Sequence, residues 1–131
     1  VITLSFLSGI GYTQIDIKLL PGTWCIISIG NDPEMPNLYT PEELMEISED
    51  FGNAQLHFTK DNFVCFIEEE ETLSDALEFK EKYVHNANQN TIVIDGDETA
   101  FAKIIKLNET EFVLLVKDEE DSFTMSFKKC D

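Results

Sequence analysis

Arginine is absent from this 131-residue sequence, and apart from two histidines its only basic residues are nine lysines. The 26 acidic residues outnumber them, so the formal net charge is −17 at pH 7. Because nucleic acids and anionic membranes are bound through clustered Lys or Arg, this balance argues against both as partners. It favours a cationic ligand, a metal ion or a basic protein instead.

Long hydrophobic runs are also missing. The apolar stretch over residues 1–10 (VITLSFLSGI) is too short to cross a bilayer, so no membrane span is expected. Residues 1–14 have two open interpretations: the remnant of a secretory signal, which would mean export, or an extra edge or swapped strand. The 43% hydrophobic content, with ten Phe, is enough for one domain with a core over residues 15–131.

Motifs for catalysis are lacking as well. The sequence has no Gly-x-Ser-x-Gly elbow, no phosphate-binding loop and no zinc-ligand spacing. One of the two histidines, His57, falls on the polar side of a predicted strand. Residues 95–98 (DGDE) resemble part of a calcium loop but lack its length and its final Glu. We therefore expect a protein that is not an enzyme and has no cofactor and no metal site.

One short helix is predicted over residues 41–50. Thr40 is a favoured N-cap, Pro41 a favoured first helical residue, and Glu43 completes a capping box. Apolar residues then follow at helical spacing, and Gly52 supplies the left-handed stop.

The rest of the sequence alternates between apolar and polar residues, as strands do. Turn residues separate the predicted strands, which cover residues 25–29, 55–59, 63–67, 91–95, 101–107, 111–117 and 122–129. Residues 73–84 fit both a helix and a strand, and we expect a strand with a helical entry. The predicted fold class is all-β with one short helix, an antiparallel up-and-down β-barrel of about eight strands.

Loop lengths predict which side chains share a face, because an even loop keeps paired positions on matching faces of antiparallel strands. A tight turn at Glu109 and Thr110 and a four-residue loop over 118–121 both predict one apolar face. Its members are Phe101, Ile105, Leu107, Phe112, Leu114, Val116, Phe123, Met125 and Phe127. The same rule, applied to the hairpin around Lys60, groups Leu56, Phe58, Phe63, Cys65 and Ile67.

This face fits the inside of a small barrel, which is either filled by side chains or holds one small ligand. Both outcomes stay open. The predicted ligand-binding residues are Phe58, Cys65, Phe101, Ile105, Phe112, Leu114, Phe123 and Met125. The opposite face is apolar in part, at Ile27, Ile29, Ile104, Val113 and Leu115. Residues 1–14, the helix or a second copy of the chain in a homodimer are the candidates to cover it.

The three cysteines show neither a Cys-x-x-Cys pair nor a Cys/His ligand spacing. Cys65 is expected to be a small core residue. Cys25 and Cys130 would lie near each other on the first and last strands of a closed barrel. Whether they form a disulfide stays open.

The order of these parts resembles the lipocalin-like domains of the calycin superfamily, especially the small secreted bacterial forms. The matching residues are 22–24 (GTW) at the first strand, the hairpins of 56–61 (LHFTKD) and 106–114 (KLNETEFVL), and 127–129 (FKK) in the last strand. The likeness covers residues 20–129. It implies that Trp24 closes the base of the barrel and that a basic residue lies over its ring. With no arginine present, Lys129 is the nearest match.

Acidic residues are concentrated in the connections expected at one end of the barrel. In an up-and-down barrel the connections after the first, third, fifth and seventh strands share an end. The predicted acidic mouth consists of Glu68, Glu70, Asp97, Asp118 and Glu120. Such a mouth attracts cations and repels fatty acids. An open alternative is that these acids only keep the protein soluble.

Two functions remain compatible with the sequence. The first is a non-catalytic, lipocalin-like binding protein, secreted, periplasmic or on the surface of a bacterium, that holds a small apolar or cationic molecule in or at the mouth of the barrel. The second is an acidic protein-interaction module, an inhibitor or immunity-like protein that binds a basic partner. The sequence does not identify the small-molecule ligand.

Overall fold

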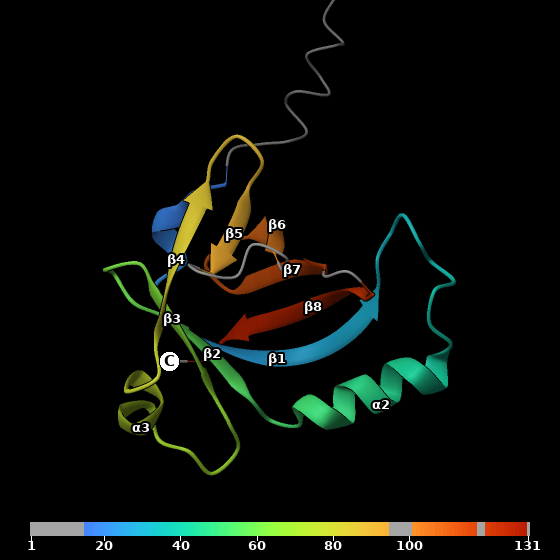
Figure 1. The fold of residues 1–131 in the computed structure, drawn as a ribbon, viewed down its shortest axis with the longest axis horizontal. Coiled ribbons are helices and arrows are strands. Elements are labelled where there is room, and N and C mark those ends of the chain that lie inside the picture. Colours follow the sequence, from blue (N-terminus) through green and yellow to red (C-terminus); the bar gives the residue numbers. More distant parts are fainter. Residues whose placement is uncertain (1–14, 95–100, 118–119, 131) are drawn as a thin grey trace, which may run out of the picture.

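Eight antiparallel strands form a closed barrel in the computed structural model, which describes residues 15–94, 101–117 and 120–130 (Figure 1). Each strand pairs with its neighbours in sequence, and β1 (Gly22–Asn31) pairs with β8 (Ser122–Lys129) to close the ring. Between them lie β2 (Gln55–Phe58), β3 (Phe63–Ile67), β4 (Glu81–Asn86), β5 (Thr91–Ile94), β6 (Phe101–Leu107) and β7 (Glu111–Lys117). The predicted fold class, an all-β up-and-down barrel with one short helix, is confirmed.

That helix, α2 (Pro41–Phe51), follows β1 and begins as its sequence predicts. The hydroxyl of Thr40 accepts a hydrogen bond from the backbone N–H of Glu43, whose carboxylate accepts one from the N–H of Thr40. Gly52, at φ 57°, ends the helix. No residue of α2 is fully buried, and its last residue, Phe51, packs against the barrel core.

Residues 73–84 are divided between a helix and a strand. The short helix α3 (Leu73–Leu77) is capped by the hydroxyl of Thr72, and β4 begins at Glu81. The expectation of a strand with a helical entry is therefore confirmed.

An aromatic cluster fills one end of the barrel, which we call the base. Trp24 is fully buried, with its ring centroid 5.3 Å from that of Phe112. Phe112 in turn lies 5.4 Å from Phe127 and 5.7 Å from Phe58. Aromatic pairs of this kind contribute about 0.5–1.5 kcal/mol each beyond the area they bury. The base is further closed by residues of the 3₁₀ helix η1 (Ile17–Leu19), which pack against this core.

Lys129 covers the Trp24 ring at the base. Its Nζ lies 4.6 Å from the ring centroid and donates a hydrogen bond of 2.8 Å to the carbonyl of Pro21. The indole N–H of Trp24 donates to the carbonyl of Leu20 at 2.9 Å. These contacts join the chain that enters β1 to the end of β8, and they place lysine where the resemblance implies a basic residue.

The pairing of β7 with β8 follows the predicted register. Leu114 lies opposite Met125, and Val116 lies opposite Phe123. The loop between these strands contains an even number of residues, as expected, so the apolar face predicted for both strands points into the barrel.

The pairing of β6 with β7 departs from the predicted register. Leu107 lies opposite Phe112 as expected, but a β-bulge between Ile104 and Lys106 puts Ile104 opposite Leu114. Ile104 is 2% exposed and belongs to the core, whereas Ile105 is 44% exposed. The prediction that Ile105 faces the interior is therefore wrong, because a bulge adds one residue to a strand and reverses the faces beyond it.

The β2–β3 hairpin also has a register other than the predicted one. The N–H of Thr59 donates to the carbonyl of Phe63 at 2.8 Å, so the turn holds the three residues 60–62. Asn62, at φ 68°, takes the left-handed position that such a turn needs. An odd loop moves every side chain of β3 to the face opposite the predicted one.

Phe58 consequently pairs with Val64, so Val64 lies on the inner face that was predicted for Phe63, Cys65 and Ile67. Cys65 and Ile67 face away from the barrel interior and pack with Ala76 of α3 in a second, smaller core. The expected burial of Cys65 is confirmed at 5% exposure, but the prediction that it lies inside the barrel is wrong.

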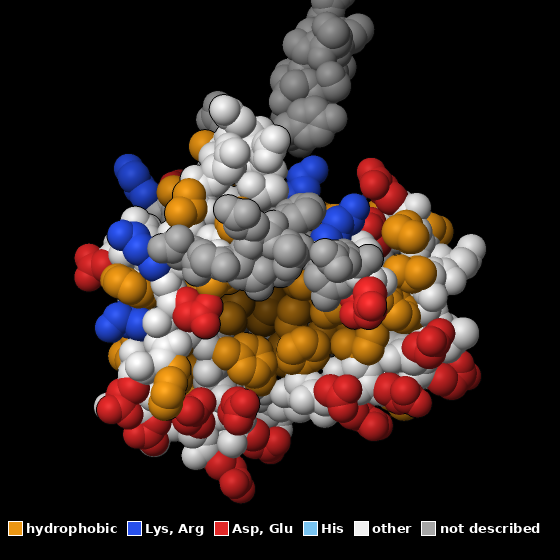
Figure 2. Space-filling model, viewed as in Figure 1, with side chains coloured by type: hydrophobic (Ala, Val, Ile, Leu, Met, Phe, Trp, Pro, Cys, Tyr) orange, Lys and Arg blue, Asp and Glu red, His pale blue; other side chains and the backbone are white. Residues whose placement is uncertain are grey.

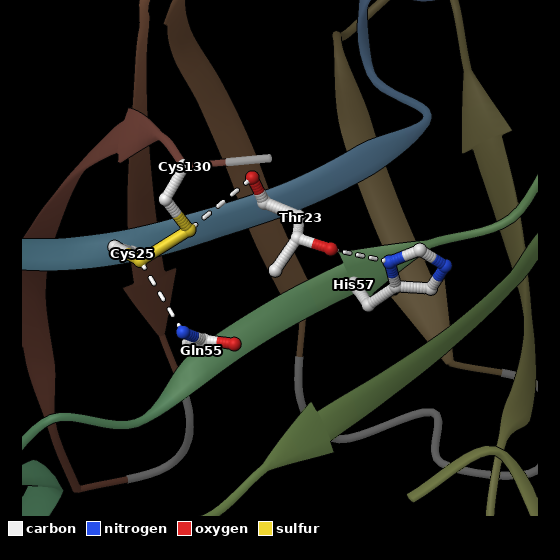
Figure 3. The surroundings of a disulfide bond; sticks show 5 residues. All are labelled: Thr23, Cys25, Gln55, His57 and Cys130. Atoms are coloured by element: carbon white, nitrogen blue, oxygen red, sulfur yellow. Dashed lines mark hydrogen bonds between the residues drawn. A yellow bond between two sulfur atoms is a disulfide. The ribbon is translucent and has the colours of Figure 1, made fainter. Parts of the chain in front are cut away.

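A disulfide joins Cys25 of β1 to Cys130, the residue directly after β8 (Figure 3). This answers the question that the sequence left open. Gln55 donates to the Sγ of Cys25 at 3.5 Å, and the hydroxyl of Thr23 is hydrogen-bonded to Nδ1 of His57 at 2.8 Å (Figure 3). Because β1 pairs with β8, the disulfide lies at the seam between the first and the last strand.

We expect the double substitution Cys25→Ser and Cys130→Ser to lower the free energy of unfolding by about 2–5 kcal/mol, because these cysteines are 105 residues apart and the crosslink restricts a long loop of the unfolded chain. Urea denaturation followed by Trp24 fluorescence measures the loss. Addition of a reducing agent should bring the wild type to the stability of the variant and leave the variant unchanged. Unaltered wild-type stability in reductant would contradict this expectation.

Lys129→Met is expected to destabilise the fold by about 1–2 kcal/mol, since it removes a cation-π contact and a charge-assisted hydrogen bond while it keeps an apolar stem. The matched control is Lys128→Met, because Lys128 is exposed on the outer face of the same strand. Thermal unfolding by circular dichroism compares the two. Equal effects of both substitutions would show that the contact with Trp24 contributes nothing.

Candidate ligand-binding site

Above the aromatic base, the barrel is not filled. A cavity of about 180 Å³, which we call the inner cavity, lies among side chains of β2, β3, β5, β6 and β7. It is lined by Leu56, Phe58, Val64, Ile92, Ile94, Ala102, Leu114 and Val116. All eight side chains are hydrocarbon, so they offer a ligand an apolar contact surface and no hydrogen-bonding group.

A second hollow of about 310 Å³, the side pocket, adjoins the inner cavity. Its lining consists of Leu56, Val64, Cys65, Phe66, Glu71, Ala76, Phe79, Glu81 and Ile94. Three of these residues, Leu56, Val64 and Ile94, also line the inner cavity, so the two spaces share walls. Two carboxylates, those of Glu71 and Glu81, give the side pocket the polar groups that the inner cavity lacks.

The end of the barrel opposite the base is partly covered by Phe51, the last residue of α2. Its ring lies 6.0 Å from that of Phe66 and 6.3 Å from that of Phe123. Figure 2 shows a hollow lined by hydrophobic side chains beside α2, with acidic side chains gathered around it. We call this end of the barrel the mouth.

The side chains predicted to bind a ligand have separate places in this arrangement. Phe58 and Leu114 line the inner cavity. Phe112 and Met125 are buried in the core, with Phe112 in the base. Phe123 is partly buried near the mouth.

Two of the other predicted residues, Ile105 and Cys65, lie outside the barrel interior. Ile105 lies on the outer surface and Cys65 lies under α3, where it borders the side pocket. The side chain of Phe101 falls outside the described residues.

The residues of the predicted acidic mouth are described in part. Glu68 and Glu70, in the link after β3, and Glu120, in the link after β7, are exposed. Asp97 and Asp118 lie outside the described residues. The ligand-attracting role of this group stays a prediction.

Two hydrogen bonds bring the acid-bearing links together. The hydroxyl of Tyr39, in the link after β1, donates to Asp121 in the link after β7 at 2.5 Å. The side-chain amide of Asn53, in the same first link, donates to Glu69 in the link after β3 at 3.3 Å. The links after β1, β3 and β7 therefore meet at the mouth.

Several residues of the cavity were missed by sequence reasoning. Val64 was missed because the turn before it was counted as even, although Asn62 tolerates the positive φ of a three-residue turn and was the available signal. Ala102 was missed because nothing in the sequence marks the bulge at Ile105. Glu71 and Glu81 were missed because the sequence fits both a helix and a strand over residues 73–84, a segment that contains Glu81 and follows Glu71 closely.

The free thiol of Cys65 borders the side pocket in a neutral form. Burial raises the pKa of Cys65, the carboxylate of Glu71 raises it further, and Lys80 acts in the opposite direction. A thiol with a raised pKa is a weak nucleophile at neutral pH. Cys65 therefore contributes an apolar wall.

The link from β1 to α2 begins at a fully buried carboxylate, that of Asp32. Asp32 accepts hydrogen bonds from the hydroxyl of Ser122 at 2.6 Å and from the N–H of Glu34 at 2.9 Å, and Nζ of Lys117 lies 3.6 Å away. These contacts, that of Ser122 above all, lower the pKa of Asp32 below its ordinary value of 3.8, against the opposing effect of burial. The carboxylate holds the first link to the start of β8.

No protein-family model matches the chain, and no curated protein is significantly similar to it. Within the described ranges, no helix is long and apolar enough to cross a membrane. The same residues contain no group of three or more His, Cys, Asp or Glu side chains placed to hold a metal ion.

Asp32→Asn is expected to lower stability at pH 7. Because the folded state lowers the pKa of Asp32, the stabilisation by its charge is present above pH 3.8 and disappears as the pH falls through the lower folded-state pKa. The difference between wild type and variant in urea midpoint should therefore shrink below pH 3.8. The control Glu34→Gln removes the same charge at an exposed position. A difference that is constant from pH 7 to about pH 2 would contradict the assignment.

Proposed function

We propose that this protein is a non-catalytic, lipocalin-like binding protein that holds a small apolar molecule inside its barrel. The observation that carries the proposal is the hydrocarbon-lined inner cavity above a solid aromatic base. An unfilled apolar cavity lacks contacts that a ligand restores, and apolar ligands bind in such spaces. Phe112 and Trp24 close the far end, so a ligand enters from the mouth or from the side pocket.

The size of the inner cavity sets the size of the ligand. A dry protein cavity of about 150 Å³ binds benzene, and the inner cavity measures about 180 Å³. A single ring or a short alkyl chain fits this space, and a larger molecule would extend into the side pocket. Among the described residues, the lining of the inner cavity is hydrocarbon and carries no nucleophile and no proton acceptor, which supports a binding role over an enzymatic one.

We also propose that the protein is exported, as the small bacterial lipocalin-like domains that it resembles are. The disulfide between Cys25 and Cys130 supports this location, because disulfides persist in oxidising compartments and are rare in the cytosol.

The acidic surface supports a second candidate, a module that binds a basic protein. Acidic side chains surround the hollow in Figure 2, and the net charge of −17 would accelerate association with a cationic partner. Salt-sensitive capture of a basic protein, without any binding of an apolar molecule, would favour this candidate.

The neutral probe hexan-1-ol should bind to the wild type and shift the amide NMR signals of Ile92, Ala102 and Leu114. Ala102→Phe puts a ring into the inner cavity and is expected to weaken binding at least tenfold, while filling of the cavity keeps the barrel folded. Ala87→Phe, the same substitution in the exposed turn after β4, should bind like the wild type.

Circular dichroism melting of both variants separates loss of binding from loss of folding. The proposal fails if hexan-1-ol does not bind to the wild type, or if a folded Ala102→Phe variant binds it with unchanged affinity.

A further inference from the structure

The side pocket adjoins the inner cavity, and the first has charged side chains in its lining whereas the lining of the second is apolar. The side chains of Leu56, Val64 and Ile94 contribute to the lining of both. The two spaces are therefore separated by no more than the width of these side chains.

The barrel wall is incomplete where the two spaces meet. The β3–β4 ladder has only two paired positions, Phe63 with Lys82 and Val64 with Glu81. β3 continues to Ile67, but α3 occupies the chain between Ile67 and β4 and packs against the outer face of β3. The gap beyond Val64 is thus bounded by α3 on one side and by the start of β4 on the other.

The carboxylates of Glu71 and Glu81 lie at this gap. Glu71 is partly buried, and its Oε1 accepts a hydrogen bond from the N–H of Glu68 at 3.1 Å, which fixes the carboxylate beside α3. The charge of Glu71 acts on the thiol of Cys65, another residue of the pocket lining. Glu81, the first residue of β4, adds a second negative charge.

One cation lies near these carboxylates. Lys80 precedes Glu81, and its Nζ lies 5.1 Å from the centroid of the Phe63 ring. Lys80 also acts on the Cys65 thiol, with a sign opposite to that of Glu71. Among the described residues, the carboxylates of Glu71 and Glu81 outnumber the ammonium of Lys80, and the exposed Glu68 and Glu70 of the adjoining link add negative charge.

We propose that the two spaces form a single site for an amphiphilic amine, a compound with a short apolar tail and a protonated amino group. The tail occupies the inner cavity, and the ammonium occupies the side pocket beside Glu71 and Glu81. A neutral headgroup gains no charge interaction there, and an anionic headgroup is repelled by both carboxylates. This assignment rests on the proposed function and adds to it the chemical class of the ligand.

Three probes with the same tail test the assignment: hexylamine, hexan-1-ol and hexanoate, each titrated at pH 7 by isothermal calorimetry or NMR. Wild-type protein should bind hexylamine at least tenfold more tightly than hexan-1-ol, and hexanoate most weakly. The double variant Glu71→Gln and Glu81→Gln should bind hexan-1-ol with unchanged affinity. Its affinity for hexylamine should decrease until it is within twofold of that for hexan-1-ol.

The matched control is the double variant Asp61→Asn and Glu109→Gln, which removes two negative charges from exposed turns after β2 and β6, at the opposite end of the barrel. It should keep the tenfold preference for the amine. An equal loss of preference in the control would show that net charge alone attracts the amine and would overturn the assignment of the side pocket.

The outcomes also separate this inference from the proposed function. Equal binding of hexylamine and hexan-1-ol by the wild type overturns the amine site and leaves the apolar cavity as a binding site. Absence of binding by all three probes overturns both.

Discussion

The structure depends on the closure of the barrel between β1 and β8. A sheet with two free edges exposes unpaired backbone groups along them, whereas a closed barrel has no free edges. Here the closing strands are joined by backbone pairing, by the contact of Lys129 with Trp24, and by the disulfide from Cys25 to Cys130. With these three kinds of contact in place, the other strands enclose an interior of fixed shape.

The interior has two parts with different packing. Rings of Trp24, Phe58, Phe112 and Phe127 fill the base, and none of them is more than 2% exposed. Smaller side chains, such as Val64 and Ala102, surround the inner cavity above. The difference follows from side-chain volume, because aliphatic residues at the same strand spacing leave space that aromatic residues fill.

The sequence predicted the fold class because strand alternation and turn residues are local signals. It also predicted α2, whose capping box lies within four residues, and the β7–β8 register, where the loop is even. The prediction from sequence failed at Cys65 and Ile105, where a difference of one residue, in the length of a turn or through a bulge, exchanges the two faces of a strand. Such a change depends on long-range pairing, which local spacing does not encode. The side pocket could not be predicted for the same reason, since it exists only where β3 and β4 separate.

Because the two parts of the barrel interior are packed differently, they restrict the sequence to different degrees. Exchanges among aliphatic residues around the inner cavity, such as Ile92, Ile94 and Val116, alter the shape offered to a ligand while the aromatic base and the β1–β8 seam continue to hold the strands. If the inner cavity binds a ligand as proposed, mutations in this upper region would change the ligand preference at little cost in folding. Within the described barrel, a proposed change in specificity would thus come from substitutions around the inner cavity, while the packing of the base restricts substitutions there.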